Sequence, residues 1–536
     1  MGRVVTWFSV RRLLTLVAAA LLPLVGTTTA VADQVVVDYQ DPLQALPPVS
    51  RPPTKSCTVT AMRHVFGNSY GHPYVGALTP PADCAGDWTK VVLDWTASSK
   101  GRQFDRLAGL WIGGAEVLRT STPEPDPSGI TWHFDRDVTA FSPLLHREQP
   151  FVVDLGNNVD NTYTGSYDVT VTVTYYMTDR AHPAPKQADV VVPLAADGTQ
   201  PGWQFLTDGH NYVRDVTVPR NTAQLKAEIY ARGGGCEEFW WSNVPTDFAT
   251  AHPEANLCGG GTYREVMVKV DGVAAGVVQP YPTIYTGGVA PMLWRPISAI
   301  DAIVTLPYTI DLTPFVGRLT DGKAHRLELV PPKGIVDNWT LGGNLFATTD
   351  PHTSQVRGML LNADVRPAIP STKVIGTGVD VSIATSAHSD WHTEGLLFTS
   401  HGPTFVRAAG EWGFDNTTTL ADNASKQTTR QRAVGDYRSG LFTRDPFDFT
   451  VNADQTLKYV DDNNYRIDAS VHMGRKIGWT DDEINTAGGF GRANGVLDYA
   501  DGHATQHWRG RTDQGKCYDR TLVAEHGWVT RDTMAC

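Results

Sequence analysis

Two short segments of the chain place a carboxylate beside aromatic residues. Segment 103–106 reads Gln-Phe-Asp-Arg, and segment 236–240 reads Cys-Glu-Glu-Phe-Trp. A carboxylate next to apolar rings costs free energy when it has no partner, so it is either paired with a cation or kept for chemistry. Each segment is followed by a strand-like stretch and then by polar residues. We therefore interpret the two segments as the two halves of one active site.

Short strands separated by turns must position these segments. The chain contains 50 glycines and 34 prolines, and segment 169–175 alternates Val and Thr with the period of a half-buried strand. Segment 267–272 reads as a strand that ends in a turn. Amphipathic helical stretches are hard to find. The sequence therefore predicts an all-β protein.

Proline spacing and internal similarity suggest the domain organisation. Prolines within 182–186 resist both helix formation and strand pairing, so this segment reads as a linker. Segments 137–141 and 311–315 have related sequences and similar surroundings, which favours a duplicated sandwich, with similar turn chemistry at two unrelated strand ends as the alternative. Long β chains commonly protect their sheet edges as jelly rolls. We expect a secretory signal peptide (1–32), an extended segment (33–55), two adjacent antiparallel β-sandwich jelly-roll domains (56–181 and 186–350) and a C-terminal β-rich domain (351–536).

The N-terminus has the pattern of a secretory leader. Three arginines flank or precede the apolar run 13–25, and small residues lead to a cleavage site expected between Ala32 and Asp33. The run is shorter than a membrane span requires, and no later stretch approaches its length. Loss of the leader changes the formal net charge from −12 to −15, which argues against nucleic acid or an anionic membrane as partner. We expect a secreted, monomeric protein with a neutral or carbohydrate partner.

Export makes disulfides plausible for the six cysteines, which allow 15 connectivities. Spacing does not choose among these connectivities, and no Cys-x-x-Cys or Cys/His grouping indicates a zinc site instead. We expect no metal or other cofactor. The pairing that we expect is local: Cys57 with Cys84, Cys236 with Cys258, and Cys517 with Cys536.

Segment 67–71 fits the G-x-S-x-G pattern of a serine nucleophile. That pattern works only where a strand turns sharply into a helix. The following segment, 72–76, reads His-Pro-Tyr-Val-Gly and is a poor helix start. We therefore expect Ser69 not to be a nucleophile and His72 to be a loop residue.

Nine short motifs occur in one order along the chain. They lie at 119–125, 129–132, 155–157, 163–167, 219–221, 238–240, 263–266, 284–288 and 293–296. Together they resemble the amidase A family of peptide-N-glycanases, over residues 55–536 and most strongly over 103–346. The resemblance implies an enzyme that cleaves the bond between an N-linked glycan and its asparagine, leaves aspartate in the peptide, and releases a glycosylamine that then loses ammonia.

A more distant similarity links the chain to the bacterial F-type glycanase, which consists of two adjacent eight-stranded jelly rolls. Its catalytic aspartate lies in a Trp-Asp-Arg element, which Phe-Asp-Arg matches here and which implies Asp105. Its second important carboxylate lies in Gly-Cys-Ala-Glu-Trp, and that similarity selects Glu238 over Glu237. A third acid would fall near Asn157, where this chain has no carboxylate and the asparagine supplies hydrogen bonds only.

Amide hydrolysis requires an activated water, a polarised carbonyl and protonation of the leaving nitrogen. Asp105 is the candidate for activating the water or for binding the sugar beside it. Glu238 would steer that water or, with its pKa raised by neighbouring rings, donate a proton. Arg106 would hold the asparagine carbonyl or orient Asp105. A strand-end salt bridge and a solvated carboxylate beside a disulfide loop are the simpler interpretations of the two acids.

Sugars bind to flat apolar faces with polar edges, and several residues near the motifs offer such groups. The substrate-binding candidates are Arg106, Asn157, Trp240, Tyr285, Trp294 and Arg295, with core packing as the alternative for the aromatic residues. Glu265 is a weaker candidate, since a strand-face salt bridge also explains it. We expect N-glycosylated peptides or denatured glycoproteins as substrates. A glycoside hydrolase that uses the same two carboxylates and a carbohydrate-binding module without turnover remain as alternatives.

Overall fold

The structure is a computed structural model that describes residues 38–440 and 444–536. Strands make up most of its regular structure and pair antiparallel within five sheets, which confirms the all-β class. The expected leader and its cleavage site after Ala32 lie outside the described residues. Among the described residues, we find no helix with the length and apolar character needed to cross a membrane.

Two four-stranded sheets face each other in the first sandwich. One sheet has the strand order β1-β8-β3-β6, and the other has the order β2-β7-β4-β5. Alternate side chains of both sheets enter one core that contains Trp95, Leu110 and Val171. The strands are β1 (Ser56–Phe66), β2 (Tyr74–Leu78), β3 (Trp88–Ser99), β4 (Leu107–Ile112), β5 (Ala115–Ser121), β6 (Ile130–Asp137), β7 (Gln149–Leu155) and β8 (Tyr167–Met177).

The second sandwich repeats this strand order. Its sheets have the orders β10-β17-β12-β15 and β11-β16-β13-β14, so each strand number is nine higher than that of its counterpart. The additional strand β9 pairs with β17. The repeated order supports the duplicated sandwich. The strands are β9 (Val190–Pro193), β10 (Gln204–Leu206), β11 (Tyr212–Val216), β12 (Thr222–Gly234), β13 (Val266–Val270), β14 (Val273–Val278), β15 (Tyr308–Asp311), β16 (His325–Val330) and β17 (Asn338–Thr349).

The duplication extends to hydrogen bonds at equivalent strand ends. After β6, Asp137 accepts a bond from Thr139 N at 2.9 Å, and the Thr139 hydroxyl accepts one from a backbone N–H of β3. After β15, Asp311 accepts a bond from Thr313 N at 2.9 Å, and the Thr313 hydroxyl accepts one from β12. Both turns continue into one 3-10 turn and one short α-helix. The sequence similarity between 137–141 and 311–315 therefore reflects the same local structure.

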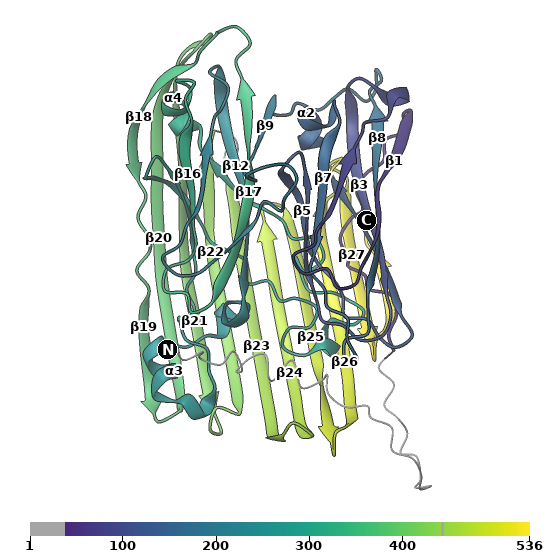
Figure 1. Cartoon of the computed structure of the whole chain (residues 1–536). Helices are drawn as coiled ribbons and strands as arrows, with labels where there is room; N and C mark the ends of the chain where they lie inside the picture. Colours follow the sequence, from purple (N-terminus) through teal and green to yellow (C-terminus); the bar gives the residue numbers. More distant parts are fainter. Residues whose placement is uncertain (1–37, 441–443) are drawn as a thin grey trace.

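Eleven strands form the C-terminal sheet, in which β20 to β28 are neighbours in sequence order and β18 and β19 both pair with β20. Figure 1 shows these green-to-yellow strands running beside both sandwiches. Trp391 and Trp412 of this sheet belong to the same core as Val277 of the second sandwich, so the two share buried surface. The strands are β18 (Arg357–Asp364), β19 (Ser371–Thr377), β20 (Asp380–Thr399), β21 (Gly402–Ala421), β22 (Lys426–Ser439), β23 (Asp445–Asp461), β24 (Asn464–Ile477), β25 (Thr480–Ala493), β26 (Val496–Arg511), β27 (Cys517–Glu525) and β28 (Trp528–Met534).

Three disulfides join Cys57 to Cys84, Cys236 to Cys258 and Cys517 to Cys536, which are the expected local pairs.

Helical elements are short and lie in the connections between strands. In the part of the chain that the structure describes, the α-helices are α2 (Ser142–Leu145), α3 (Thr246–Ala251) and α4 (Val316–Leu319), and the 3-10 turns are η2 (Ala82–Cys84), η3 (Thr139–Phe141), η4 (Gly235–Glu237), η5 (Trp240–Ser242), η6 (Pro253–Ala255), η7 (Pro291–Trp294) and η8 (Thr313–Phe315).

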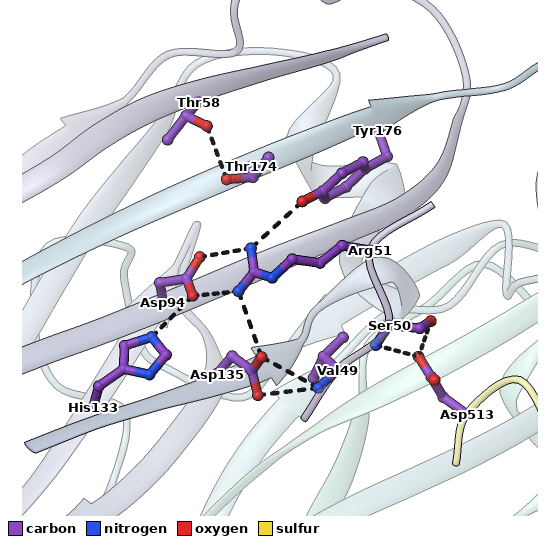
Figure 2. A network of polar contacts seen from close by, with 10 residues as sticks. All are labelled: Val49, Ser50, Arg51, Thr58, Asp94, His133, Asp135, Thr174, Tyr176 and Asp513. Carbon is purple, nitrogen blue, oxygen red and sulfur yellow. Dashed lines mark hydrogen bonds and ion pairs between the residues drawn. The ribbon is translucent and has the colours of Figure 1, made fainter. Parts of the chain in front are cut away.

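The segment that leads into β1 is held by side chains of several elements (Figure 2). Arg51 donates hydrogen bonds to Asp94 of β3 and also pairs with Asp135 of β6. The neighbouring Ser50 donates through its backbone and hydroxyl groups to Asp513, which lies between β26 and β27. The lead-in segment thus fastens the first sandwich to the C-terminal sheet.

Candidate active site

Asp105 lies immediately before β4, where the first sandwich meets a loop of the second. Its Oδ2 accepts a hydrogen bond of 2.9 Å from the backbone N–H of Gly287. Nearby, the Thr286 hydroxyl donates to the carbonyl of Thr122 at 2.7 Å, which holds the two sandwiches together at this point. Burial raises the pKa of Asp105, against the opposing effects of the Gly287 N–H and of the charges on Arg232 and Arg106.

Arg106 has partners other than a direct pairing with its neighbour Asp105. Its Nη1 donates to the Tyr70 hydroxyl at 3.0 Å, its Nη2 donates to Gln103, and its backbone N–H donates to Thr122 Oγ1 at 2.8 Å. The guanidinium also lies 5.6 Å from the centre of the Phe104 ring. A local salt bridge between Asp105 and Arg106 was the simpler interpretation of segment 103–106. Arg106 instead takes part in a hydrogen-bond network that orients the segment.

Asn157 supports this segment from behind. Its side chain is fully buried, and its Nδ2 donates to the carbonyls of Phe66 and Gly165. Gln103 donates to the same Gly165 carbonyl at 3.0 Å. The two amides thus hold the backbone next to Asp105, and Asn157 has no exposed surface with which to contact a substrate.

The two adjacent glutamates after β12 have different environments. Glu237 is fully buried and accepts two hydrogen bonds from Arg264, at 2.6 and 2.9 Å, and one from Trp339 Nε1 at 2.9 Å. Val336 N donates a further bond at 3.1 Å. The side chain of Glu238 keeps 18% of its surface exposed. Glu237 is thus committed to structure, and Glu238 is the carboxylate of this pair that a substrate could reach.

A sharp turn separates the two glutamates from β12. Gly235 has a φ of 61°, and a Cβ placed on it would lie 1.9 Å from Asp337 Oδ2. Only glycine satisfies both conditions without displacing that carboxylate. Cys236 follows, and its disulfide to Cys258 closes the long loop between β12 and β13. Local backbone chemistry therefore fixes the direction in which Glu238 leaves the strand.

Arg232 connects the two candidate acids. It lies on β12, its Nη2 is 3.7 Å from Glu238 Oε2, and its guanidinium lies 4.3 Å from the centre of the Tyr285 ring. Burial lowers the pKa of Arg232, but Tyr285, Glu238 and Asp105 together raise it above its ordinary value. One guanidinium therefore interacts with carboxylates from both sandwiches, and its side chain is 17% exposed.

A second acid–arginine pair lies beside Asp105. Arg295 Nη2 donates to Glu124 Oε2 at 3.3 Å, and both side chains are 11% exposed. A Cβ placed on Gly287 would lie 2.4 Å from Glu124 Oε1 and 3.3 Å from Asp105 Oδ2, so the two carboxyl groups approach the same backbone unit. Burial, opposed by Arg295 and reinforced by the charge of Asp105, raises the pKa of Glu124 to about 8.

The aromatic candidates are buried next to this cluster. Trp294 is 2% exposed and donates from Nε1 to the Gly288 carbonyl at 2.7 Å, so it supports the turn that carries Gly287. Tyr285, also 2% exposed, forms the platform under Arg232. Trp240, at 3%, belongs to the core of the second sandwich. These rings shape the site chiefly by packing.

Glu265 lies in a different environment from the candidate site. It accepts hydrogen bonds from the Tyr263 hydroxyl at 2.9 Å and from Ala368 N at 3.1 Å. Burial raises its pKa to about 7. These contacts join the start of β13 to the segment between β18 and β19, so Glu265 has a structural role here.

The rejected serine motif lies in the loop between β1 and β2. Ser69 is 5% exposed and donates from its hydroxyl to the Leu155 carbonyl at 2.6 Å. The segment is not a strand-to-helix elbow. The Ser69 hydroxyl thus bonds to the backbone at the end of β7, at a position without the geometry of a nucleophile elbow.

The structure thus brings together Asp105, Glu238, Arg295 and Tyr285, and it adds Arg232 and Glu124, which the sequence analysis missed. Glu124 stands between two prolines inside a family motif, which is a signal. Arg232 lies just before the Gly-Gly-Gly-Cys turn but is one of several charged residues of β12, so its sequence gives little signal.

Comparisons with known proteins show the family of the chain. Residues 45–366 match the family model described as peptide N-acetyl-β-D-glucosaminyl asparaginase amidase A. The peptide-N4-(N-acetyl-β-glucosaminyl)asparagine amidase A of Prunus dulcis is 31% identical over 404 residues, which cover 72% of this chain and 71% of that protein. The structure of PNGase F, a glycosylasparaginase from Flavobacterium meningosepticum, aligns with 14% identity and a TM-score of 0.36 over 55% of this chain and 96% of that one. The chain belongs to the peptide N-acetyl-β-D-glucosaminyl asparaginase amidase A family.

Proposed function

We propose that this protein is a peptide-N-glycanase that hydrolyses the amide bond between an N-linked glycan and its asparagine. The observation that carries the proposal is the meeting of two acids from different sandwiches. Asp105 accepts a hydrogen bond from Gly287, two residues after Tyr285. The Tyr285 ring lies under Arg232, which pairs with Glu238. Family membership supplies the bond that is cleaved. The products are a peptide with aspartate in place of asparagine and a glycosylamine, which loses ammonia in water.

Asp105 takes a proton from the attacking water in this proposal. Its raised pKa makes it a better proton acceptor near neutral pH than an ordinary aspartate. The water oxygen bonds to the amide carbon, and the carbonyl oxygen gains negative charge. The guanidinium of Arg232 stabilises that charge because a fixed cation in a partly buried site needs little reorganisation.

Glu238 positions the water from the other side of Arg232. When the tetrahedral intermediate collapses, the carbon–nitrogen bond breaks, and the proton taken from the water passes to the leaving nitrogen. The hydroxyl of the water remains on the new aspartate. No atom or electron is unaccounted for, and no cofactor enters the scheme.

The proposed setting is extracellular. The leader pattern and the three disulfides suit an exported protein, because disulfides persist in oxidising compartments. We infer that the protein acts as a monomer on N-glycosylated peptides or denatured glycoproteins. Nucleic acids and membranes are not expected partners of an acidic chain.

Incubation with a defined N-glycopeptide, followed by mass spectrometry of the peptide, tests the proposal. The wild type should convert the glycosylated asparagine to aspartate. Asp105→Asn should lower that rate by ~10²-fold or more, whereas Asp168→Asn, which changes an exposed acid of β8, should leave it unaltered. A peptide that retains one GlcNAc would identify a glycoside hydrolase, and full activity of Asp105→Asn would remove Asp105 from the mechanism.

A further inference from the structure

A group of three potential metal ligands lies on the C-terminal sheet, apart from the candidate active site. One ligand atom each from Asp501, His503 and His526 lies within 4.8 Å of the other two. Asp501 is partly buried and both histidines are exposed. The sequence analysis expects no metal, because the chain has no Cys/His spacing of the zinc-binding kind. These residues come together only through strand pairing.

The sheet determines how the first two ligands face. Gly502, between them on β26, packs so closely on η7 that an added Cβ would lie 2.1 Å from the Met292 carbonyl oxygen. Neighbouring residues of a strand point to opposite faces. Asp501 and His503 therefore share the face of the sheet that is turned away from η7.

The third ligand comes from the turn between β27 and β28. His526 has a φ of 52°, and its N–H donates to the Gly502 carbonyl at 2.8 Å. Gly527 follows with a φ of 83°. Two successive positive φ values describe the tight hairpin turn that asparagine and glycine normally occupy. A histidine at the first position is an unusual choice there and places an imidazole next to Asp501.

The ligand atoms lie close together, with each imidazole beside a different oxygen of Asp501. His526 Nδ1 lies 2.8 Å from Asp501 Oδ1, and His503 Nε2 lies 3.2 Å from Asp501 Oδ2. The two imidazole rings meet edge to face, with their centres 4.8 Å apart. Nitrogen and oxygen ligands of tetrahedral zinc lie about 2.0–2.2 Å from the metal and hence about 3.3 Å from each other. Small side-chain rotations would suffice to exchange the hydrogen bonds for metal bonds.

We propose that Asp501, His503 and His526 bind a divalent transition-metal ion of the zinc type. Two imidazoles and one carboxylate suit Zn²⁺ better than Ca²⁺ or Mg²⁺, which prefer oxygen ligands alone. Glu525 lies directly across from His503 in the ladder and adds negative charge to the site. His503 also lines a hollow of about 580 Å³, so a fourth ligand can reach the ion from solvent.

The ion would strengthen a contact that extends to the N-terminal segment. Gln40 N donates to the Gly527 carbonyl at 2.9 Å, and Gln40 Oε1 accepts from Val529 N at 3.1 Å. The adjacent Tyr39 ring lies 5.0 Å from the guanidinium of Arg295. Zinc that fixes His526 to β26 thus stabilises the turn against which the lead-in segment packs, independently of the amidase reaction.

Calorimetric titration of the untagged, full-length protein with Zn²⁺ tests this proposal. We expect one ion per chain and a thermal transition that moves upward with zinc concentration, as mass action requires. His526→Ala and Asp501→Asn should each weaken binding about tenfold or more and remove the thermal shift, because each deletes one metal bond. His472→Ala is the matched control, since His472 lines the same hollow without belonging to the ligand group.

Two outcomes would overturn the proposal. One is a wild type that takes up no zinc at about 100 µM, since structural zinc sites bind far more tightly than this. The other is zinc binding that Asp501→Asn and His526→Ala leave unchanged, which would assign the ion to other histidines and leave this group with hydrogen bonds alone.

Discussion

The same chemical change at two adjacent residues should have opposite consequences. Glu237→Gln and Glu238→Gln each replace a carboxylate with an amide of nearly the same shape. We expect the first substitution to destabilise the fold and the second to abolish catalysis while the fold remains. The reason is the difference in surroundings, with Glu237 fully buried and Glu238 partly exposed beside Arg232.

The magnitude at Glu237 follows from its contacts. Its two oxygens accept four hydrogen bonds, two of them from the fully buried Arg264. An amide keeps one acceptor oxygen and turns an NH₂ group toward donors, so Arg264 loses its counter-charge inside the protein. Removing one partner of a buried ion pair costs about 3–5 kcal/mol.

The magnitude at Glu238 differs because its ion pair with Arg232 is longer, at 3.7 Å, and reaches solvent. Pairs of that kind contribute about 1 kcal/mol or less to stability. Loss of a group that positions the attacking water should instead lower kcat/KM by about 10²-fold or more. The two variants should therefore differ in two measured quantities, the stability of the fold and kcat/KM.

Urea denaturation followed by circular dichroism measures the stability, and initial rates on a defined glycopeptide measure kcat/KM. We expect a clearly lower midpoint for Glu237→Gln and a midpoint close to the wild type for Glu238→Gln. Normal stability of Glu237→Gln together with lost activity would show that the assignment of the two glutamates is reversed. Wild-type activity of Glu238→Gln would exclude Glu238 from the reaction.

Two further substitutions test the surroundings of Asp105. Gly287→Ala places a Cβ 2.4 Å from Glu124 Oε1, and the flexible Glu124 side chain can move away from it. We therefore expect a stability within about 1 kcal/mol of wild type but a kcat/KM reduced at least about tenfold, and wild-type kcat/KM would contradict the placement of Gly287 beside the reacting groups. Gly67→Ala is the control, because a Cβ on Gly67 points into open space. Glu124→Gln tests the pKa of about 8, which is raised from 4.5 by burial and the charge of Asp105 against Arg295. Between these values the unfolded chain has released the proton that the folded chain keeps, so Glu124 makes stability fall as pH rises through that window. The variant should lose less stability than wild type between about pH 5 and pH 8 in urea midpoints, and identical slopes would show that Glu124 is ionised in the fold.

Local patterns made much of the fold predictable. The alternation of Val and Thr over 169–175 became β8, because residues two apart face one side of a strand whatever lies around it. The similarity of 137–141 and 311–315 was informative because the strand-end turn is stabilised by bonds within a few residues of Asp137 and Asp311. The three disulfides are the local pairs that we expected, although cysteine spacing alone leaves 15 connectivities open.

The site could be predicted only where a motif identified the residue. Asp105 and Glu238 stand in such motifs, but Arg232 looks like any charged residue in a strand until the second sandwich meets the first. Residue type also cannot show which side of an element becomes buried. Trp240 and Asn157 therefore read as sugar contacts, although one packs into the core and the other holds backbone.

The duplication explains why two unlike segments meet in one site. Asp105 lies in the connection between β3 and β4, and Glu238 lies in the connection between β12 and β13, which are equivalent positions of the two sandwiches. The first connection, 100–106, is short, and its ends are held by neighbouring strands. The second, 235–265, is long, and ordering it costs conformational entropy that the first does not incur. The disulfide between Cys236 and Cys258 and the buried pair of Glu237 with Arg264 both act on this longer connection. The residues on either side of Glu238 thus serve mainly to hold its carboxylate in place. Glu237, the buried acid of the segment, therefore has a structural role and no part in the proposed reaction.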